Sequence, residues 1–527
     1  MPTAEIQRII LIIGLAATAY LMMLAWNEDY GRPAEAPRTE APTLATLPAD
    51  PPVGHPVQAP GTSDVPDESM IGPVGAQDSN ARASDASAAS DAAGSRDAQS
   101  MQERLVKVTT NDLEVWIDRL GGDIVRVQLP GFPVSLDRLD VPFVLLDRGN
   151  GRTYVAQSGL IGPDGTDSGG QRPLFSANAL DFDFRESDGS VELHTRVGAV
   201  EVTKVFTFQR DGHLVTLEYQ IDNRGNEPFS VGMFAQLKRD GQPIEEGGGF
   251  GLGPRPYLGA ALTTSEERYL KLGFDDLDDE DFRETVTGGW IAILQHYFLS
   301  AWIGDPADNN FYYGQRRNDG TYIVGFTSPV QRVEPGQLTT FRISFYAGPK
   351  DQKTLEKISP NLNLTIDYGF LWWIAVPLFY LLDWLHGFVN NWGVAIILLT
   401  VVVKSVLYPL SAARYRSMAK RRTVAPQMKR LQERYADDRQ KLSQEMMTLY
   451  KKEKANPLGG CLPILVQMPV FIALYWVLFE SVELRQAPFL LWIDDLSAMD
   501  PFFVLPILMG ASMFFQQTLN PPMPDPT

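Results

Sequence analysis

Apolar residues recur along this chain with two different periods. Between about Leu105 and Gly348, short segments alternate apolar and polar residues, which is the period of a strand with one buried face. Turn signals such as Asp211-Gly212 separate these segments. Many short strands with such turns predict a β-sandwich domain, which we place at residues 104–359. One predicted strand face consists of Val202, Lys204, Phe206 and Phe208.

Uninterrupted apolar runs elsewhere predict helices that cross a membrane. About 20 apolar residues span the hydrocarbon layer as a helix. Four runs approach this length and predict transmembrane spans at residues 9–26, 392–410, 461–479 and 502–519. A shorter run, Phe370–Leu382, is rich in aromatic residues and predicts an interfacial amphipathic helix over residues 368–388. The fold class is therefore a multi-pass α-helical membrane protein with a large β-sandwich domain.

The remaining segments complete the predicted organisation. Residues 27–103 are rich in Pro, Ala, Ser and Asp, so we expect a disordered linker. An even number of crossings puts residues 1–8 and 520–527 on the same, cytoplasmic side, and residues 480–501 form a loop on the opposite side. The sandwich then lies on that outer side, which is the periplasm if the chain is in a Gram-negative inner membrane.

Charge supports this orientation. The whole chain carries a formal net charge of −18. Residues 411–457 hold 13 basic and five acidic side chains, a balance of +8 that leaves −26 for the rest. A short basic loop beside a span marks the cytoplasmic side. Apolar residues recur within it at helical spacing, so we expect a basic cytoplasmic helical hairpin, although two helices lying along anionic lipid fit the pattern equally well.

Lys404 is the principal candidate functional residue. It lies inside the predicted span 392–410, where a charge costs roughly 2.5–3.5 kcal/mol on insertion scales. Its long side chain could reach the interface by snorkelling. Thr400 lies one helical turn earlier, and Gln467 lies in the next span. Together, these polar groups favour a water-filled groove over isolated hydrogen bonds between helices.

Enzyme and metal signatures are missing from the sequence. We find no phosphate-binding loop, no nucleophile elbow and no His-Glu-x-x-His motif. The five histidines are scattered and the single cysteine is Cys461, so the sequence predicts no metal site and no cofactor. The acidic bulk argues against recognition of a specific nucleic acid sequence.

Five stretches carry a resemblance to a known family. They are Arg342–Asp351 (RISFYAGPKD), Asn391–Leu410 (NWGVAIILLTVVVKSVLYPL), Ser443–Leu478, Ser481–Pro501 and Leu505–Phe515 (LPILMGASMFF). This part of the chain resembles the YidC family of membrane-protein insertases of Gram-negative inner membranes. The anchor, linker and sandwich are similar to that family in arrangement, and the sandwich resembles the sugar-mutarotase class of fold.

The resemblance implies a mechanism and a set of partners. A positive charge in a hydrophilic groove is expected to draw the acidic tail of a client partway into the bilayer, and the client helix then leaves along an apolar slide. It assigns Lys404, Thr400 and Gln467 to the substrate groove, and Met468 and Phe471 to the slide. The implied partners are nascent membrane proteins, the Sec translocon, the ribosome and membrane lipids. The recruiting basic residues are Arg414, Arg416, Lys420, Arg421, Arg422, Lys429 and Arg430.

Two departures from the family pattern change the expectations. The family usually has an arginine at the position of Lys404, and lysine keeps the charge but lacks the five-donor fork. The family also has two further spans, so we expect the complete protein to continue beyond Thr527. Two other functions stay open on the residues alone: a membrane-anchored periplasmic carbohydrate-binding or mutarotase-like protein, and a channel or carrier.

Overall fold

The computed structural model describes residues 64–66, 104–149, 151–242, 256–435, 438–453 and 462–519. They all belong to one compact unit, Thr62–Thr527. The predicted anchor 9–26, most of the predicted linker 27–103, the predicted loop 520–527 and Cys461 lie outside the described residues.

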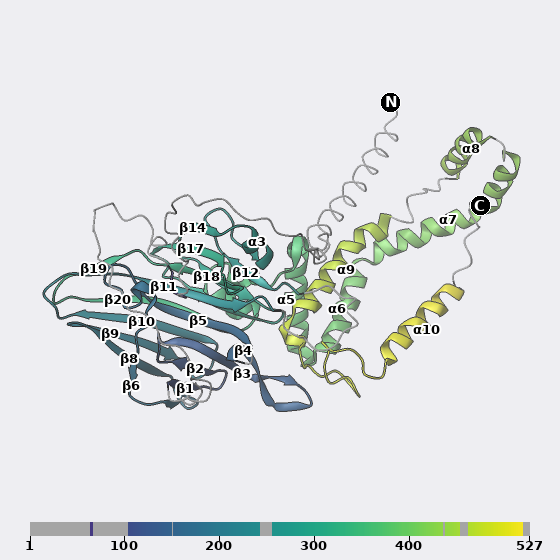
Figure 1. Ribbon diagram of the computed structural model, residues 1–527. Coiled ribbons are helices and arrows are strands. Elements are labelled where there is room, and N and C mark those ends of the chain that lie inside the picture. The colour runs from purple at the N-terminus through teal and green to yellow at the C-terminus, as the bar shows by residue number, and fades with distance from the viewer. Residues whose placement is uncertain are drawn as a thin grey trace, which may run out of the picture. The chain divides into compact units, whose positions relative to one another are not determined.

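The sandwich consists of two large β-sheets (Figure 1). All their strand pairs are antiparallel except the pair of β1 and β7. In spatial order, the first sheet contains β14 (Phe282–Thr287), β17 (Asn309–Arg316), β18 (Thr321–Thr327), β11 (Phe229–Asp240), β5 (Arg152–Ile161), β4 (Arg138–Gly149), β3 (Asp123–Ser135), β2 (Glu114–Asp118), β1 (Leu105–Thr109) and β7 (Asp181–Asp183), with β19 (Gln331–Val333) beside β11. The second contains β13 (Leu270–Gly273), β12 (Gly259–Leu262), β15 (Trp290–Leu294), β16 (Phe298–Ile303), β20 (Leu338–Pro349), β10 (Leu214–Asn223), β9 (Val200–Phe208), β8 (Gly189–Val197) and β6 (Ser176–Ala177).

The predicted strand face on β9 is confirmed. Val202, Lys204, Phe206 and Phe208 are all buried, while the residues between them are partly or fully exposed. Among the described residues Lys204 has no ion-pair partner, and its buried ammonium donates instead to three backbone carbonyls, those of Gly121 (3.1 Å), Gly122 (2.6 Å) and Ser158 (3.3 Å). Burial lowers the pKa of Lys204 to about 7.

One part of the nine-stranded sheet, formed by β12, β15 and β16, is buried on both faces. On β15, Ile291 and Ile293 join the core between the two sheets, whereas Trp290, Ala292 and Leu294 join a second apolar cluster. Side chains alternate between the faces of a strand, so each face packs against a different layer. This explains why β15 is apolar throughout rather than alternating.

Eight helices accompany the sandwich among the described residues. Their bounds are α3 (Phe274–Asp279), α4 (Gln352–Ile358), α5 (Trp372–Val389), α6 (Trp392–Val406), α7 (Tyr408–Arg434), α8 (Arg439–Lys452), α9 (Leu462–Glu480) and α10 (Val504–Leu519). Short 3-10 turns lie at Ser168–Gly170, Leu362–Thr365, Gly369–Leu371 and Val482–Leu484.

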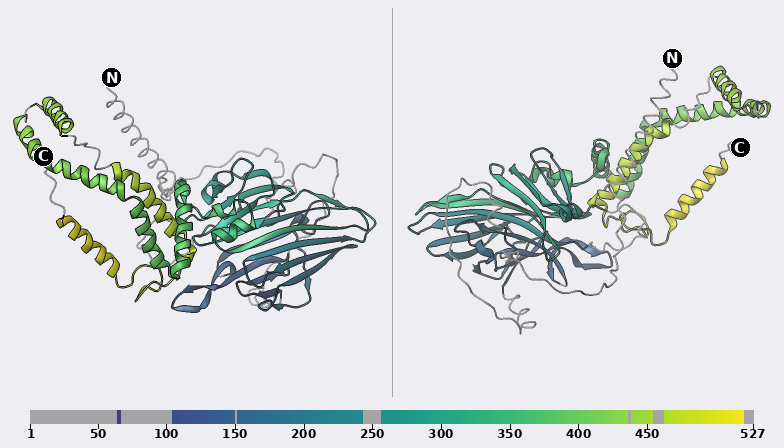
Figure 2. Two further views of the ribbon diagram at one scale, coloured as in Figure 1. Left: turned by 180° about the vertical axis from the view of Figure 1, so that it is seen from behind. Right: turned by 45° about the horizontal axis from the view of Figure 1, so that its top comes forward.

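The second apolar cluster joins the sandwich to three helices. It contains Leu299 of β16, Phe379 of α5, Leu399 of α6 and Val477 of α9, all of which are buried. Helices α5, α6 and α9 lie side by side in both views of Figure 2. The outer face of the nine-stranded sheet thus packs on the same cluster as the apolar helices.

The helix expected over residues 392–410 is broken at Leu407. α6 ends at Val406, and α7 begins at Tyr408 at an angle of 56° to it. Pro409 accounts for the break, since proline has no N–H and fits the first turn of a new helix. The expected basic hairpin over residues 411–457 is therefore formed by α7 and α8, and α7 begins inside the predicted span.

Length and composition single out one continuous stretch, Gly369–Val389, as able to cross a membrane alone. The pair of α6 with the first part of α7 passes the same test as a bent unit, and Leu465–Glu480 is apolar but shorter. These statements concern only the part of the chain that the structure describes. The helix predicted over residues 368–388 corresponds to α5. α5 continues beyond the apolar run Phe370–Leu382 on which the prediction was based, and the interfacial position stays a prediction.

Part of the predicted linker is ordered. Asp64, Val65 and Pro66 lie within residues 27–103, yet Val65 is only 8 % exposed and packs against Ile161 and Phe234 of the sandwich. The expectation of a disordered linker is therefore wrong for these three residues. The composition of the whole segment does not reveal this short motif, whose central residue, Val65, is apolar.

Candidate functional site

α6 positions Lys404. The side chain of Asn391 accepts a hydrogen bond from the backbone N–H of Val394 (3.0 Å) and so starts the helix. Leu399 and Val403 are buried against the second apolar cluster, while Lys404 is exposed. Because Leu399 and Val403 pack against the cluster, α6 has a fixed orientation about its own axis. The Lys404 ammonium therefore points away from the cluster.

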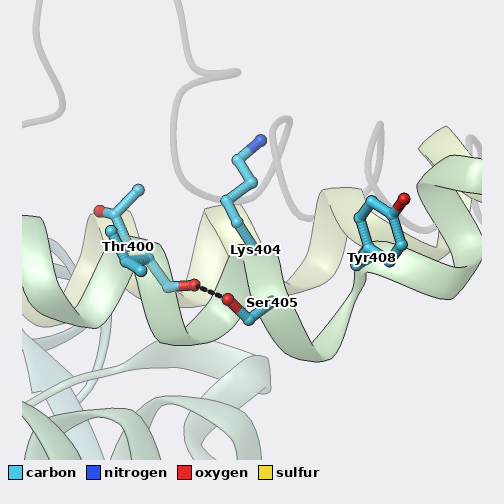
Figure 3. A pocket seen from close by; sticks show the side chains of 5 residues that line it. Thr400, Lys404, Ser405 and Tyr408 are labelled. Carbon is cyan, nitrogen blue, oxygen red and sulfur yellow. Dashed lines mark hydrogen bonds between the residues drawn. The ribbon is translucent and has the colours of Figure 1, made fainter.

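An open hollow lies at the exposed side of α6. It has a volume of about 530 Å³ and is lined by Thr400, Val401, Lys404, Ser405 and Tyr408. Figure 3 shows Thr400, Lys404 and Tyr408 at successive turns of the helical segment. The structure thus brings two of the three predicted groove residues, Thr400 and Lys404, together at one hollow.

The two hydroxyls on this helix are satisfied by their own backbone. Thr400 Oγ1 donates to the carbonyl of Ile396 (2.9 Å). Ser405 Oγ donates to the carbonyl of Val401 (2.7 Å), which Figure 3 shows as a dashed line. Each oxygen still has acceptor capacity, whereas the Lys404 ammonium can only donate. The hollow therefore offers one full positive charge beside weak polar groups.

Phe471 of α9 lies beside this charge. The Lys404 ammonium is 4.7 Å from the centre of the Phe471 ring, which is a cation–π distance. Among the described residues, no carboxylate lies within ion-pair distance of Lys404. The residue expected on the apolar slide and the residue expected in the groove thus touch each other.

Gln467 and Met468 occupy different surroundings on α9. Gln467 is 8 % exposed, and its Nε2 donates to the Ser411 hydroxyl of α7 (3.3 Å). Gln467 does not line the hollow at Lys404, so its expected place beside the charge is not seen. Met468 is 41 % exposed, as a side chain that meets lipid or a client would be.

The predicted recruiting residues all lie on α7. Arg416 and Arg430 are exposed. The backbone of α7 also carries Arg414, Lys420, Arg421, Arg422 and Lys429, whose side chains lie outside the described part of the structure. A basic helix therefore follows immediately after the hollow.

A second cluster of polar contacts ties the sandwich to the C-terminal end of α9. Lys350 forms a buried ion pair with Glu480 (2.8 Å), and the His296 ring lies 3.0 Å from the Phe479 carbonyl. In the loop that follows, Arg485 and Gln486 each donate to the carbonyl of Pro133 (2.8 Å). These contacts fix the sandwich on the helices that carry the hollow.

Sequence reasoning missed Tyr408 and Lys350. Tyr408 follows Lys404 by four residues, the same spacing at which Thr400 precedes it, so helical periodicity alone would have found it. Lys350 gave no signal, because it follows a β-strand and its partner Glu480 lies 130 residues away. Among the described residues, no group of three or more His, Cys, Asp or Glu side chains has an arrangement that would hold a metal ion.

The fold and site define an integral membrane protein in which an apolar helix carries an exposed cation, Lys404, beside a packed β-sandwich. Residues 105–381 match the YidC periplasmic domain family, and residues 384–527 match the family described as 60Kd inner membrane protein. The chain belongs to the YidC family of membrane protein insertases. It is accordingly an inner-membrane insertase, not an enzyme, as the sequence predicted.

Relatives of known name agree with this membership. A membrane protein insertase YidC from Azotobacter vinelandii is 48 % identical over 525 residues, covering 99 % of this chain and 90 % of that protein. The same name is given to a protein from Pseudomonas fluorescens at 47 % identity and to one from Stutzerimonas stutzeri at 47 %, each with the same coverage.

Solved structures with a similar arrangement are more distant. A galactose mutarotase related enzyme from Lactobacillus acidophilus covers 46 % of this chain and 97 % of its own, with a TM-score of 0.31 and 10 % identity. A galactose mutarotase-like protein from Lactobacillus casei has a TM-score of 0.30 and 10 % identity, and covers 46 % of this chain and 99 % of its own. Nothing about sugar chemistry follows from likeness at this level.

Proposed function

We propose that this insertase receives client segments in the hollow at Lys404. The observation that carries the proposal is an exposed ammonium on an apolar helix, beside an open hollow and without a carboxylate partner in the described chain. A carboxylate from an arriving client would supply the missing charge. At about 4 Å and an effective dielectric constant of about 20, the pair attracts by roughly 4 kcal/mol.

Phe471 gives the client a second surface. While no client is bound, the centre of its ring lies 4.7 Å from the Lys404 ammonium. A client carboxylate attracts the ammonium more strongly than the ring does, so it can replace this cation–π contact. Once the acidic tail is neutralised, the apolar helix of the client leaves past Met468, which is exposed on the same helix. In this scheme the charge starts insertion and the apolar surface completes it.

The topology that suits this scheme puts α7 and α8 in the cytoplasm and the sandwich in the periplasm. Basic residues close to a span favour the cytoplasmic side. The hollow at Lys404 and Tyr408 then opens next to the basic helix α7, where clients arrive from the ribosome. The sandwich, fixed by Lys350 and Glu480, lies at the far end of α9.

Three further partners belong to the proposal, two suggested by exposed residues and one by the family resemblance. Arg416 and Arg430 are exposed cations suited to ribosomal RNA and to anionic lipid headgroups. The apolar surface of α10, whose Ile507, Phe514 and Phe515 are at least 63 % exposed, suits lipid or a client helix. Work beside the Sec translocon is part of the proposal and rests on the family resemblance.

Site-specific photo-crosslinking tests where clients bind. A photoreactive amino acid placed at Tyr408 or at Val401 should capture a ribosome-bound client with an acidic tail. The control position is Arg196 on the sandwich, which is exposed and far from the hollow in sequence. Equal capture at Arg196 and at Tyr408 would contradict the proposed entry site.

A further inference from the structure

The outer face of the eleven-stranded sheet carries a docked piece of the linker. Val65 packs against Ile161 of β5 and Phe234 of β11, which are 1 % and 0 % exposed. Phe234 lies on the opposite side of β11 from Met233 and Ala235, which belong to the core between the sheets. The linker segment therefore covers the side of the sheet that faces away from the other sheet.

A buried polar network holds the backbone of this segment. Gln236 is 1 % exposed, and its Nε2 donates to the carbonyl of Asp64 (2.7 Å). The same amide is oriented by two neighbours, because Nε2 also donates to Gln157 (2.9 Å) and Oε1 accepts from the Tyr313 hydroxyl (2.7 Å). One amide proton of Gln236 on β11 is thus directed at the linker by Gln157 of β5 and Tyr313 of β17.

Charge complementarity adds to this contact. Lys238 follows Gln236 on the same face of β11, and its ammonium lies 2.5 Å from Asp64 Oδ1 and 3.1 Å from Asp319 Oδ2. The Lys238 side chain is only 9 % exposed. A lysine at such burial needs partners for its charge, and Asp64 is the nearer of the two.

The three linker residues supply matching chemistry. Asp64 brings a carboxylate and a carbonyl, Val65 brings a branched apolar side chain, and Pro66 is buried as well. Proline restricts the free chain, so less conformational entropy is lost when the segment docks. The linker as a whole is rich in Pro, Ala, Ser and Asp, so these three residues are distinguished by their contacts and burial rather than by their composition.

We infer that the strip formed by Phe234, Gln236 and Lys238 is a peptide-binding site whose occupant is the Asp64–Pro66 motif of the same chain. Docking divides the linker at this point. Among the described residues, the first one attached to the sandwich then follows the predicted anchor after 37 residues (27–63) instead of 77 (27–103). Since an extended chain spans at most about 3.3–3.6 Å per residue, docking halves the greatest reach of that segment.

Hydrogen exchange of the full chain in lipid nanodiscs tests the inference. In the wild-type protein, the backbone amides of Asp64 and Val65 should exchange at least tenfold more slowly than in Asp64→Asn or Lys238→Met, a difference of about 1.4 kcal/mol. Asp85→Asn, which changes another linker acid, is the matched control and should leave these rates unchanged. Unchanged exchange in β10 and β20 shows that the sandwich stays folded. Equal rates in wild type and Asp64→Asn would overturn the inference.

A peptide added in trans provides a second measurement. A labelled peptide with the sequence of residues 60–70, PGTSDVPDESM, should bind the full-length Val65→Ser variant, whose own motif no longer fills the site. Binding should be at least tenfold weaker when Lys238→Met is added. Fluorescence anisotropy measures both affinities, and equal binding by the two variants would overturn the inference.

Discussion

Lys350 and Glu480 form a buried ion pair between the end of the sandwich and the end of α9. The ammonium lies 2.8 Å from the carboxylate, and each side chain is 4 % exposed. A buried charge that loses its partner is costly, on the order of 3–5 kcal/mol, whereas removing both charges costs much less. The pair therefore fixes where the sandwich joins the helices more than it adds to net stability.

This relationship predicts a non-additive double-mutant cycle. Lys350→Met and Glu480→Gln should each lower the thermal unfolding temperature of the purified protein in detergent. The double variant should recover most of the loss, since no uncompensated charge remains buried. An exposed pair, Arg332 and Glu334, is the control and should show a coupling of at most about 1 kcal/mol. Simple additivity at Lys350 and Glu480 would contradict the buried pairing.

Glu483, three residues after Glu480, predicts that the stability of the contact between the sandwich and α9 depends on pH. Burial first, and then the charges of Asp351 and Asp383, raise the pKa of Glu483 from its ordinary 4.5 to about 7, against an opposing effect of Lys353. Between pH 4.5 and 7 the folded chain keeps a proton that the unfolded chain has lost. Stability should therefore fall as pH rises through this window and level off above it.

The measurement is the unfolding temperature between pH 5 and pH 8. A shift of one pKa unit corresponds to about 1.4 kcal/mol, so the loss should reach at most ~3 kcal/mol. Glu483→Gln removes the titrating group and should flatten this part of the profile. If the variant keeps the full pH dependence of the wild type, another group is responsible.

Two glycines on neighbouring helices predict opposite effects of the same substitution. A Cβ at Gly393 of α6 would overlap the ring of Phe489, whereas a Cβ at Gly387 of α5 would meet nothing within 4 Å. Gly393→Ala should therefore cost roughly 1–3 kcal/mol through overpacking. Gly387→Ala should stabilise by roughly 0.5–1 kcal/mol, because alanine loses less backbone entropy in a helix. Thermal unfolding of the two variants compares them directly, and a loss at both positions would be unexpected.

Arg416 and Arg430 predict a salt-dependent association with the ribosome. Reversing both charges with Arg416→Glu and Arg430→Glu should weaken cosedimentation with ribosomes at least tenfold, at about 1 kcal/mol or more per basic residue near an anionic surface. It should also lower the slope of binding against salt concentration. Arg138→Glu with Arg196→Glu, two exposed sites on the sandwich, is the control pair. An equal loss in the control pair would mean that total charge, not α7, governs binding.

The features that could be predicted from the sequence are those with a regular spacing between residues close together in the chain. Alternation gave the buried face of β9, including Lys204, and helical spacing gave Thr400 beside Lys404. The break at Leu407 escaped prediction, although Pro409 was visible, because an apolar run through a proline reads as one span. Tyr408 was missed although its spacing of four residues from Lys404 was visible in the sequence.

Contacts between distant segments left no local pattern. Arg485 and Pro133 lie 352 residues apart, and Val65 lies 169 residues before Phe234. The apolar residues of β15 do not themselves show that different layers cover its two faces, because a sequence does not say which layer covers each face. Only the folded chain shows that one face of this sheet packs on the other sheet and the other on helices.

The most direct measurement of the central claim is the insertion of one client with an acidic tail into liposomes that contain Lys404→Glu or Lys404→Arg. Protease protection of the translocated tail reports insertion. If the charge of Lys404 attracts the tail, Lys404→Arg should insert the client about as well as the wild type, and Lys404→Glu should lose insertion. A client with an uncharged tail should be affected much less by either substitution. Normal insertion of the acidic-tailed client by Lys404→Glu would contradict the account.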